Sequence, residues 1–104
     1  MKIVQVTYTT IAEYVPQNQA NIKIVMSEVR KLNAPGINYK SCLSQDGKTF
    51  IHTAFFSTDE DEKALTTLPA FLDFQQQLQA SGLEVPPKQD LLTLVGSSKD
   101  ILSS

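Results

Sequence analysis

The first residues of the chain alternate between apolar and polar side chains, a pattern that predicts a strand. Within residues 2–10, Val4, Val6 and Tyr8 form one strongly apolar face, because successive side chains along a strand point to opposite sides. A second strand is predicted over residues 37–44, "INYKSCLS".

The segment between these two strands has apolar residues at helical spacing. These residues share one face of a helix; they are Ile22, Val25, Met26, Val29 and Leu32. Pro16 suits the first helical turn, where its missing N–H would have no partner. Asn33 and the Pro35-Gly36 pair are typical of a helix end. We therefore expect one amphipathic helix between Pro16 and Asn33.

The third predicted strand, residues 48–57, carries bulky apolar side chains on both faces. Phe50 and Phe56 fall on one face, whereas Ile51 and Phe55 fall on the other. This pattern is typical of a strand that is buried on both sides.

Residues 57–82 predict a second helical region. Ser57 or Thr58 can cap its start, and the acidic residues that follow suit the positive end of the helix dipole. Pro69 should kink or restart the helix, and Gly82 should end it. The remaining residues predict a loop over 84–89, a strand over 90–98 and a short tail over 99–104.

The predicted order of elements is β-α-β-β-α-β in a single domain, residues 1–104. With right-handed crossovers, this order gives the ferredoxin-like α+β fold, a four-stranded antiparallel sheet with two helices on one face. The other face then has no cover within the chain, although the third strand places apolar side chains there. Such a face needs a partner. We expect a homodimer, because two-fold dimers are the commonest closed assembly.

Composition limits the partners and the compartment. Lys and Arg number 9 against 11 Asp and Glu, so the net charge is −2 and no basic patch predicts nucleic-acid binding. No apolar stretch reaches the roughly 18 residues of a membrane span, and the polar start is unlike a signal peptide. The one cysteine, Cys42, suits a reducing compartment, and we expect it to be buried as a small apolar residue. These features predict a cytoplasmic protein without membrane contact.

The chain resembles the antibiotic-biosynthesis-monooxygenase-like proteins of the dimeric α+β barrel superfamily, and among them small bacterial proteins without an assigned activity. The resemblance rests on "GINYKSCLSQDGKTFIHTAFF", "LTTLPAFLDFQQQL" and a terminal "LTLVGS", and it covers nearly the whole chain. It implies a dimeric barrel and, in some members, cofactor-free oxygenation of aromatic polyketides. Haem-degrading members carry an Asn on the first strand, a Trp on the sheet and a His on the second helix, and this chain has none of these.

His52 is the only histidine, and it lies in the third strand. If Asp46-Gly47 is a two-residue hairpin turn, Ser41 lies directly opposite His52, and opposite residues share a face. A three-residue loop with a bulge would pair His52 with Lys40 instead. We favour the first register, because it gathers the aromatic residues on the face of His52.

That register surrounds His52 with apolar residues and a few polar groups, as in a small-molecule pocket. His52 is then the candidate catalytic base, and the candidate ligand-binding residues are Tyr8, Tyr39, Ser41, Phe50 and Phe71. The alternative is a structural histidine that is hydrogen-bonded to a neighbouring hydroxyl. The sequence contains no Ser-His-Asp set, no metal-ligand spacing and no phosphate-binding glycine loop, so we expect no metal and no cofactor.

Two functions of different classes remain open. The chain is either a cofactor-independent monooxygenase-like or small apolar ligand-binding protein, or a non-catalytic structural dimer module. The first requires an enclosed pocket that touches His52. A structural dimer would fill that space with side chains.

Overall fold

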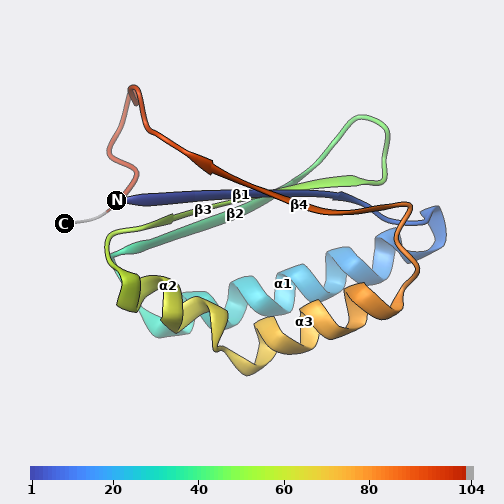
Figure 1. Ribbon diagram of the computed structural model, residues 1–104. Coiled ribbons are helices and arrows are strands. Elements are labelled where there is room, and N and C mark those ends of the chain that lie inside the picture. The colour runs from blue at the N-terminus through green and yellow to red at the C-terminus, as the bar shows by residue number, and fades with distance from the viewer. Residues whose placement is uncertain (103–104) are drawn as a thin grey trace.

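The structure is a computed structural model that describes residues 1–102; residues 103 and 104 of the predicted tail lie outside this part. The elements are β1 (Lys2–Thr9), a 3-10 helix (Ala12–Tyr14), α1 (Val15–Leu32), β2 (Ile37–Leu43), β3 (Thr49–Phe56), α2 (Asp59–Thr66), α3 (Pro69–Ala80) and β4 (Val85–Leu92). The strands form one antiparallel sheet in the order β2-β3-β1-β4, and the helices cover one of its faces (Figure 1). The predicted ferredoxin-like α+β fold is confirmed.

β2 and β3 pair in the predicted register, with Ser41 opposite His52. Beyond the end of β2, the N–H of Ser44 still donates a hydrogen bond to the carbonyl of Thr49 at 2.8 Å. The loop that joins the two strands therefore has four residues, 45–48, rather than the two of the predicted turn. The Asp46 carboxylate accepts hydrogen bonds from two backbone N–H groups that follow it, and in this loop only Gly47 has a positive φ, of 79°. Because two and four residues have the same parity, every side chain of the hairpin still lies on its predicted face.

The second helical region consists of two helices, because Pro69 restarts the chain as α3. Thr58 caps α2 as expected. Its side chain accepts a hydrogen bond from the N–H of Asp61, and the Asp61 carboxylate accepts one from the N–H of Thr58, both at 3.2 Å. Gly36 lies against this capping box, where a Cβ would collide with the Asp61 carboxylate.

The last strand begins earlier than predicted. β4 covers Val85–Leu92, so most of the expected loop over 84–89 is strand, and residues 93–98 are not. Pro86 and Pro87 argued against a strand, because proline cannot donate a ladder hydrogen bond. They are tolerated here because β4 is an edge strand, with only one side of its backbone paired.

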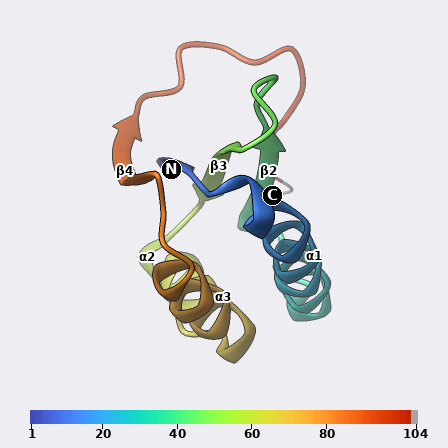
Figure 2. The same cartoon turned by 90° about the vertical axis from the view of Figure 1, so that its right-hand side faces the viewer.

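The segment after β4 passes over the sheet face opposite the helices and reaches β2 (Figure 2). Asn38 on β2 donates a hydrogen bond through Nδ2 to the carbonyl of Ile101 at 2.8 Å. On that face, Ile3 and Phe55 are 5% and 7% exposed. The expectation that the chain leaves this face without any cover is therefore wrong, because the C-terminal segment crosses it.

The core fills the space between the sheet and the helices. Its main buried cluster contains Tyr8, Val25, Phe50, Phe74 and Leu78, and a smaller one contains Ala54, Phe56 and Leu65. The predicted apolar face of α1 points into this core through Val25, although Leu32 at its end is exposed. The polar groups of the candidate site lie within this apolar layer.

Candidate functional site

His52 is held between two tyrosines on the sheet face that the helices cover. Its Nε2 lies 2.7 Å from the Tyr8 hydroxyl, and its Nδ1 lies 2.8 Å from the Tyr39 hydroxyl. Tyr8 comes from β1 and Tyr39 from β2, the two neighbours of β3 in the sheet. The register of three strands therefore sets this arrangement, because each tyrosine is a diagonal cross-strand neighbour of His52.

Asn18 connects this trio to the helix layer. It lies on α1, is fully buried, and donates a hydrogen bond through Nδ2 to the Tyr8 hydroxyl at 2.8 Å. Asn18 was not among the predicted site residues, although the sequence carries a signal for it. Asn18 precedes Ile22 and Val25 by four and seven residues, so it falls on the apolar face of α1. A polar residue on such a face needs a buried hydrogen-bond partner.

Burial keeps the three titratable groups of the site neutral. It lowers the pKa of His52 from 6.5 to about 4, because removal from water disfavours the imidazolium. It also raises the pKa of both Tyr8 and Tyr39 well above the ordinary value of a phenol. At neutral pH, the site therefore contains a neutral imidazole and two protonated phenols.

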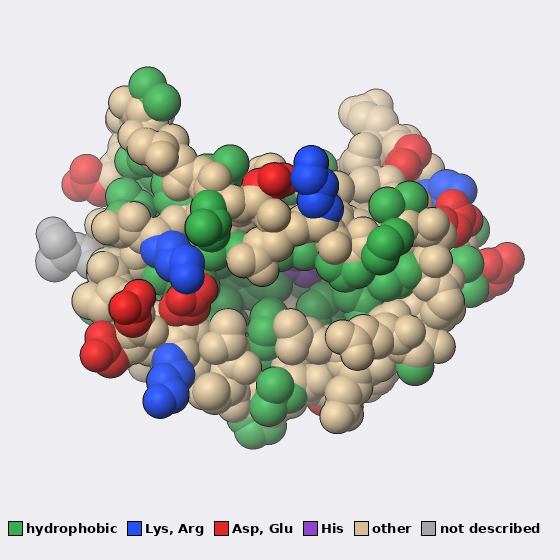
Figure 3. All heavy atoms as spheres, in the orientation of Figure 1, with side chains coloured by type: hydrophobic (Ala, Val, Ile, Leu, Met, Phe, Trp, Pro, Cys, Tyr) green, Lys and Arg blue, Asp and Glu red, His purple; other side chains and the backbone are tan. Residues whose placement is uncertain are grey.

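A cavity of about 210 Å³ adjoins this polar cluster, between the sheet and the helices. Its walls are mainly apolar and include Val4, Val6, Leu65, Phe71 and Phe74. Side chains of β4 and α3 border it on one side. Figure 3 shows a hollow between these two elements, with hydrophobic side chains and the purple of histidine inside it. An apolar chamber with a few convergent polar groups is the usual form of a small-molecule site.

The predicted site residues border two concavities. Tyr8, Tyr39, His52 and Phe71 line the cavity, and Tyr39 lies between the two, because it also lines the second one. Ser41 and Phe50 line a groove on the other side of Tyr39 instead. The Ser41 hydroxyl is 3.5 Å from Nε2 of His52, at the limit of a hydrogen bond, and Phe50 stacks on Tyr8 at a centroid distance of 5.6 Å.

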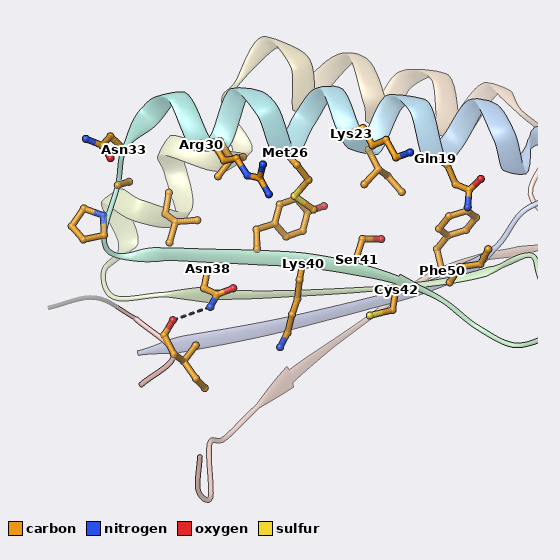
Figure 4. A pocket seen from close by; sticks show the side chains of 18 residues that line it. Gln19, Lys23, Met26, Arg30, Asn33, Asn38, Lys40, Ser41, Cys42 and Phe50 are labelled. Carbon is orange, nitrogen blue, oxygen red and sulfur yellow. Dashed lines mark hydrogen bonds between the residues drawn. The ribbon is translucent and has the colours of Figure 1, made fainter. Parts of the chain in front are cut away.

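That groove has a volume of about 970 Å³ and lies between α1 and β2 (Figure 4). The exposed, charged side chains of Lys23 and Arg30 border it. Lys40, although it is near, extends from β2 toward the opposite face of the sheet (Figure 4). The groove therefore suits an apolar ligand less well than the cavity does.

Cys42 is exposed, so the prediction of a buried cysteine is wrong. It neighbours Ser41 on β2 and therefore points to the opposite side of the sheet from the core. No group of three or more His, Cys, Asp or Glu side chains within residues 1–102 is placed to hold a metal ion. In the same part of the chain, no helix has both the length and the apolar character of a membrane span.

Comparison with known proteins finds similar folds but no similar sequence. No family model matches the chain, and no curated protein matches it either. Solved structures do resemble it. A proposed antibiotic biosynthesis monooxygenase from Bacteroides thetaiotaomicron has a TM-score of 0.81 at 10% identity, over 95% of this chain and 93% of that chain. A proposed antibiotic biosynthesis monooxygenase from Deinococcus radiodurans has a TM-score of 0.74 at 15% identity, over 99% and 100%.

A third similar structure has a stated activity. It is a mutant of SnoaB, a cofactor-independent oxygenase from Streptomyces nogalater, with a TM-score of 0.68 at 13% identity over 95% of this chain and 98% of that chain. Identities this low establish the fold alone, because one fold can host many functions. The chain therefore has the ferredoxin-like α+β fold of the antibiotic biosynthesis monooxygenase-like proteins, as its sequence resemblance predicted.

Proposed function

We propose that this protein binds a small, mostly apolar aromatic molecule in the cavity beside His52 and oxidises it with O₂, as a cofactor-independent monooxygenase-like protein. The observation that carries the proposal is the Asn18–Tyr8–His52–Tyr39 cluster, buried except for the partly buried Tyr39, at the wall of an apolar cavity. Buried polar groups are expensive to maintain in a small core. Their convergence on a cavity favours a ligand over a purely structural role.

The size of the cavity sets the size of the ligand. An apolar protein cavity of about 150 Å³ can hold benzene, so about 210 Å³ has room for one substituted ring or a compact bicyclic molecule. Phe71 and Phe74 would contact the faces or edges of that ring, since both line the cavity and lie near His52 and Tyr39.

The chemistry needs no cofactor where the substrate itself supplies the electrons. An activated methylene on an aromatic ring system reacts as CH₂ + O₂ → C=O + H₂O, so that one oxygen atom enters the product and the other leaves as water. The substrate first loses a proton to solvent through the open side of the hollow (Figure 3) and then reacts as its anion, in which charge gathers on an oxygen atom. Neutral hydrogen-bond donors in a dry site stabilise such an anion more strongly than water does. The site can supply a neutral tyrosine hydroxyl that is held in place by His52.

We also propose that the protein acts as a homodimer. The end of β4 and the chain that follows it, residues 91–95, form an arm with the large, exposed apolar side chains of Leu91, Leu92, Leu94 and Val95, and Val95 is fully exposed. Consecutive exposed apolar residues of this kind mark an interaction surface. A second copy of the chain would cover this arm, together with the parts of the outer sheet face that the C-terminal segment leaves open.

The exposed thiol of Cys42 supports a cytoplasmic location for this dimer. A free, accessible cysteine persists most readily in a reducing compartment. We therefore propose the cytoplasm as its site of action.

One observation favours a second function. The cavity is smaller than the roughly 300 Å³ at which small-molecule pockets usually begin. A structural dimer module without a ligand would also have a small cavity, and the histidine would then only connect three strands.

Oxygen uptake separates these functions. Purified protein is given a panel of small phenols and of bicyclic ketones with an activated methylene group, and O₂ consumption is followed with an electrode. We expect substrate-dependent uptake by the wild type and at least about a tenfold loss in His52→Gln. A matched control is Thr53→Val, which changes the next residue of β3 on the opposite face and should retain the activity. Equal inertness of wild type and His52→Gln, with both folded, would support the structural module.

A further inference from the structure

The hydrogen-bond chain around His52 has a direction. The Asn18 amide is oriented with Nδ2 toward Tyr8 and leaves its own Oδ1 without a partner among the residues that the structure describes. Because Nδ2 can only donate, the oxygen of Tyr8 accepts from it in this orientation. Within residues 1–102, the Tyr8 hydroxyl has one other partner, Nε2 of His52 at 2.7 Å. The single hydrogen of Tyr8 therefore goes to Nε2, which must be a bare acceptor nitrogen.

The direction of the hydrogen bonds continues through the imidazole ring. A neutral imidazole carries one hydrogen, and with Nε2 bare this hydrogen lies on Nδ1. It points to the oxygen of Tyr39 at 2.8 Å, so Tyr39 accepts from His52. Ser41 is consistent with this direction, because its hydroxyl can only contribute a weak additional donor to Nε2 at 3.5 Å.

The hydroxyl hydrogen of Tyr39 remains. In the described part of the chain, this hydroxyl has His52 as its one hydrogen-bond partner. Because the Tyr39 oxygen accepts from Nδ1, its own hydrogen has no protein acceptor, while its side chain lines the cavity. Tyr39 is partly buried. A donor that is removed from water without an acceptor is unfavourable, and a ligand in the cavity can supply the acceptor.

We propose that the Tyr39 hydroxyl is the hydrogen-bond donor that the cavity presents to its ligand, and that the ligand carries an acceptor oxygen, a ketone, quinone or phenolate oxygen, on an apolar ring system. The proposal rests on the proposed function and names the substrate class of that same site. Tyr39 is the binding residue. His52 and Asn18 are positioning residues, which orient Tyr39 through the chain of hydrogen bonds.

This assignment changes the role of His52. Both ring nitrogens are engaged, one as acceptor and one as donor, so the imidazole does not remove a proton from the ligand directly. Instead, each group polarises the next, which strengthens the final donor. A donor already oriented toward the position of a developing oxyanion stabilises it without reorganisation.

The tautomer of His52 tests the first half of the inference without any ligand. Long-range ¹H–¹⁵N correlation spectra at pH 7 distinguish a protonated ring nitrogen from a bare one. We expect the hydrogen on Nδ1 in the wild type. A hydrogen on Nε2 would overturn the inference, whatever the protein binds.

Asn18→Leu should weaken this preference, because Tyr8 no longer receives a hydrogen bond that fixes its direction, and both tautomers should become populated. Asn21→Leu is the matched control. Asn21 lies on the same helix, is also buried, and bonds Gln17 and Gln77 rather than Tyr8, so this variant should keep the wild-type tautomer. An unchanged tautomer in folded Asn18→Leu would contradict the role of Asn18. If Asn18→Leu does not fold, the wild-type spectrum and the binding test of Tyr39 still decide the inference.

Binding of 1-indanone and indane tests the second half. The two molecules have nearly the same shape, and only 1-indanone has a ketone oxygen. One hydrogen bond contributes about 0.5–1.5 kcal/mol net, so the wild type should bind the ketone about two- to thirteenfold more tightly. Tyr39→Phe should bind both equally, whereas the control Tyr14→Phe, outside the cavity, should keep the preference.

The outcomes separate the inference from the proposed function. If the wild type binds 1-indanone and indane equally well, the inference is wrong while ligand binding in the protein stands. If it binds neither of them nor any member of the phenol panel, the proposed function is wrong and the inference is overturned with it.

Discussion

The Tyr39 hydroxyl lies 2.8 Å from Nδ1 of His52, on the side of the ring opposite Tyr8. His52 is thereby fixed from β1 and from β2 at once, although it belongs to β3. Its orientation follows from the register of three strands rather than from a loop. A site built in this way is rigid, which is what a preorganised hydrogen-bond donor requires.

The neutrality of His52 should make folding stability depend on pH. In the unfolded chain His52 has a pKa near 6.5, and in the folded protein burial lowers it to about 4. Its contribution is therefore complete above pH 6.5 and decreases as the pH falls toward 4, because only the unfolded chain binds the proton there. We expect about 3 kcal/mol of stability to be lost over this window through His52, at about 1.4 kcal/mol per pH unit.

Urea denaturation of wild type and His52→Gln at several pH values between 7.5 and 4 measures this effect. The carboxylates titrate in both proteins, so the difference between them isolates the histidine. Two parallel curves would mean that the imidazole is protonated as easily in the folded protein as in the unfolded chain.

Phe74 should be the residue of α3 on which the core depends most. It is 5% exposed and contacts both His52 and Phe71 at ring-centroid distances of 5.7 and 6.1 Å. Phe74→Ala should reduce the free energy of unfolding by about 3–5 kcal/mol. The same truncation at exposed Leu72, two residues earlier, should change it by less than about 1 kcal/mol.

Phe71 makes a useful comparison with Phe74. It is only half-buried and borders the cavity. Phe71→Ala should therefore reduce stability less than Phe74→Ala does and should enlarge the cavity. Chemical denaturation that ranks Phe71→Ala as the more damaging change would show that α3 packs by a different face.

Gly36 should tolerate no side chain. A Cβ at this position would meet the carboxylate of Asp61, the residue that completes the capping box of α2. Gly36→Ala should displace that carboxylate and lower stability by about 1–2 kcal/mol, the contribution of a helix cap. Gly96→Ala is the matched control, because nothing lies within 4 Å of a Cβ there. Thermal unfolding with equal midpoints for the two variants would contradict this account of the cap.

The exposed arm, residues 91–95, should control assembly. Sedimentation equilibrium at micromolar concentration should give a mass near twice the 11.5 kDa of the chain. Val95→Asp places a charge on the most exposed apolar side chain of the arm and should shift the protein toward the monomer. A wild type that sediments as a stable monomer would contradict the dimer.

Parity explains how much of the site could be predicted from the sequence. Opposite residues share a face, so any loop with an even number of residues places His52 on the same sheet face as Ser41. In the structure, this is the face toward the helices. The type of loop could not be predicted in the same way, because Asp-Gly occurs both in two-residue turns and, as here, inside a longer loop in which the aspartate accepts hydrogen bonds from the backbone.

Other features depend on contacts between distant segments. β4 was missed at Pro86-Pro87, because an edge strand cannot be recognised before the strand order is known. Asn18 fell on an apolar helix face, but its partner, Tyr8, is ten residues away on another element. Cys42 was expected to be buried because cysteine is a small apolar residue. Its position in β2, however, places it on the sheet face opposite His52, where it is exposed.

Chemical-shift mapping with 1-indanone tests the central claim most directly, since the protein offers two concavities. If the cavity is the site, shifts are expected at His52, Phe71 and Phe74, which line the cavity and not the groove, together with signals from β4 and α3 at its edge. Shifts confined to Lys23, Met26 and their neighbours would place the ligand in the groove between α1 and β2 and would contradict the proposal that the cavity beside His52 is the functional site.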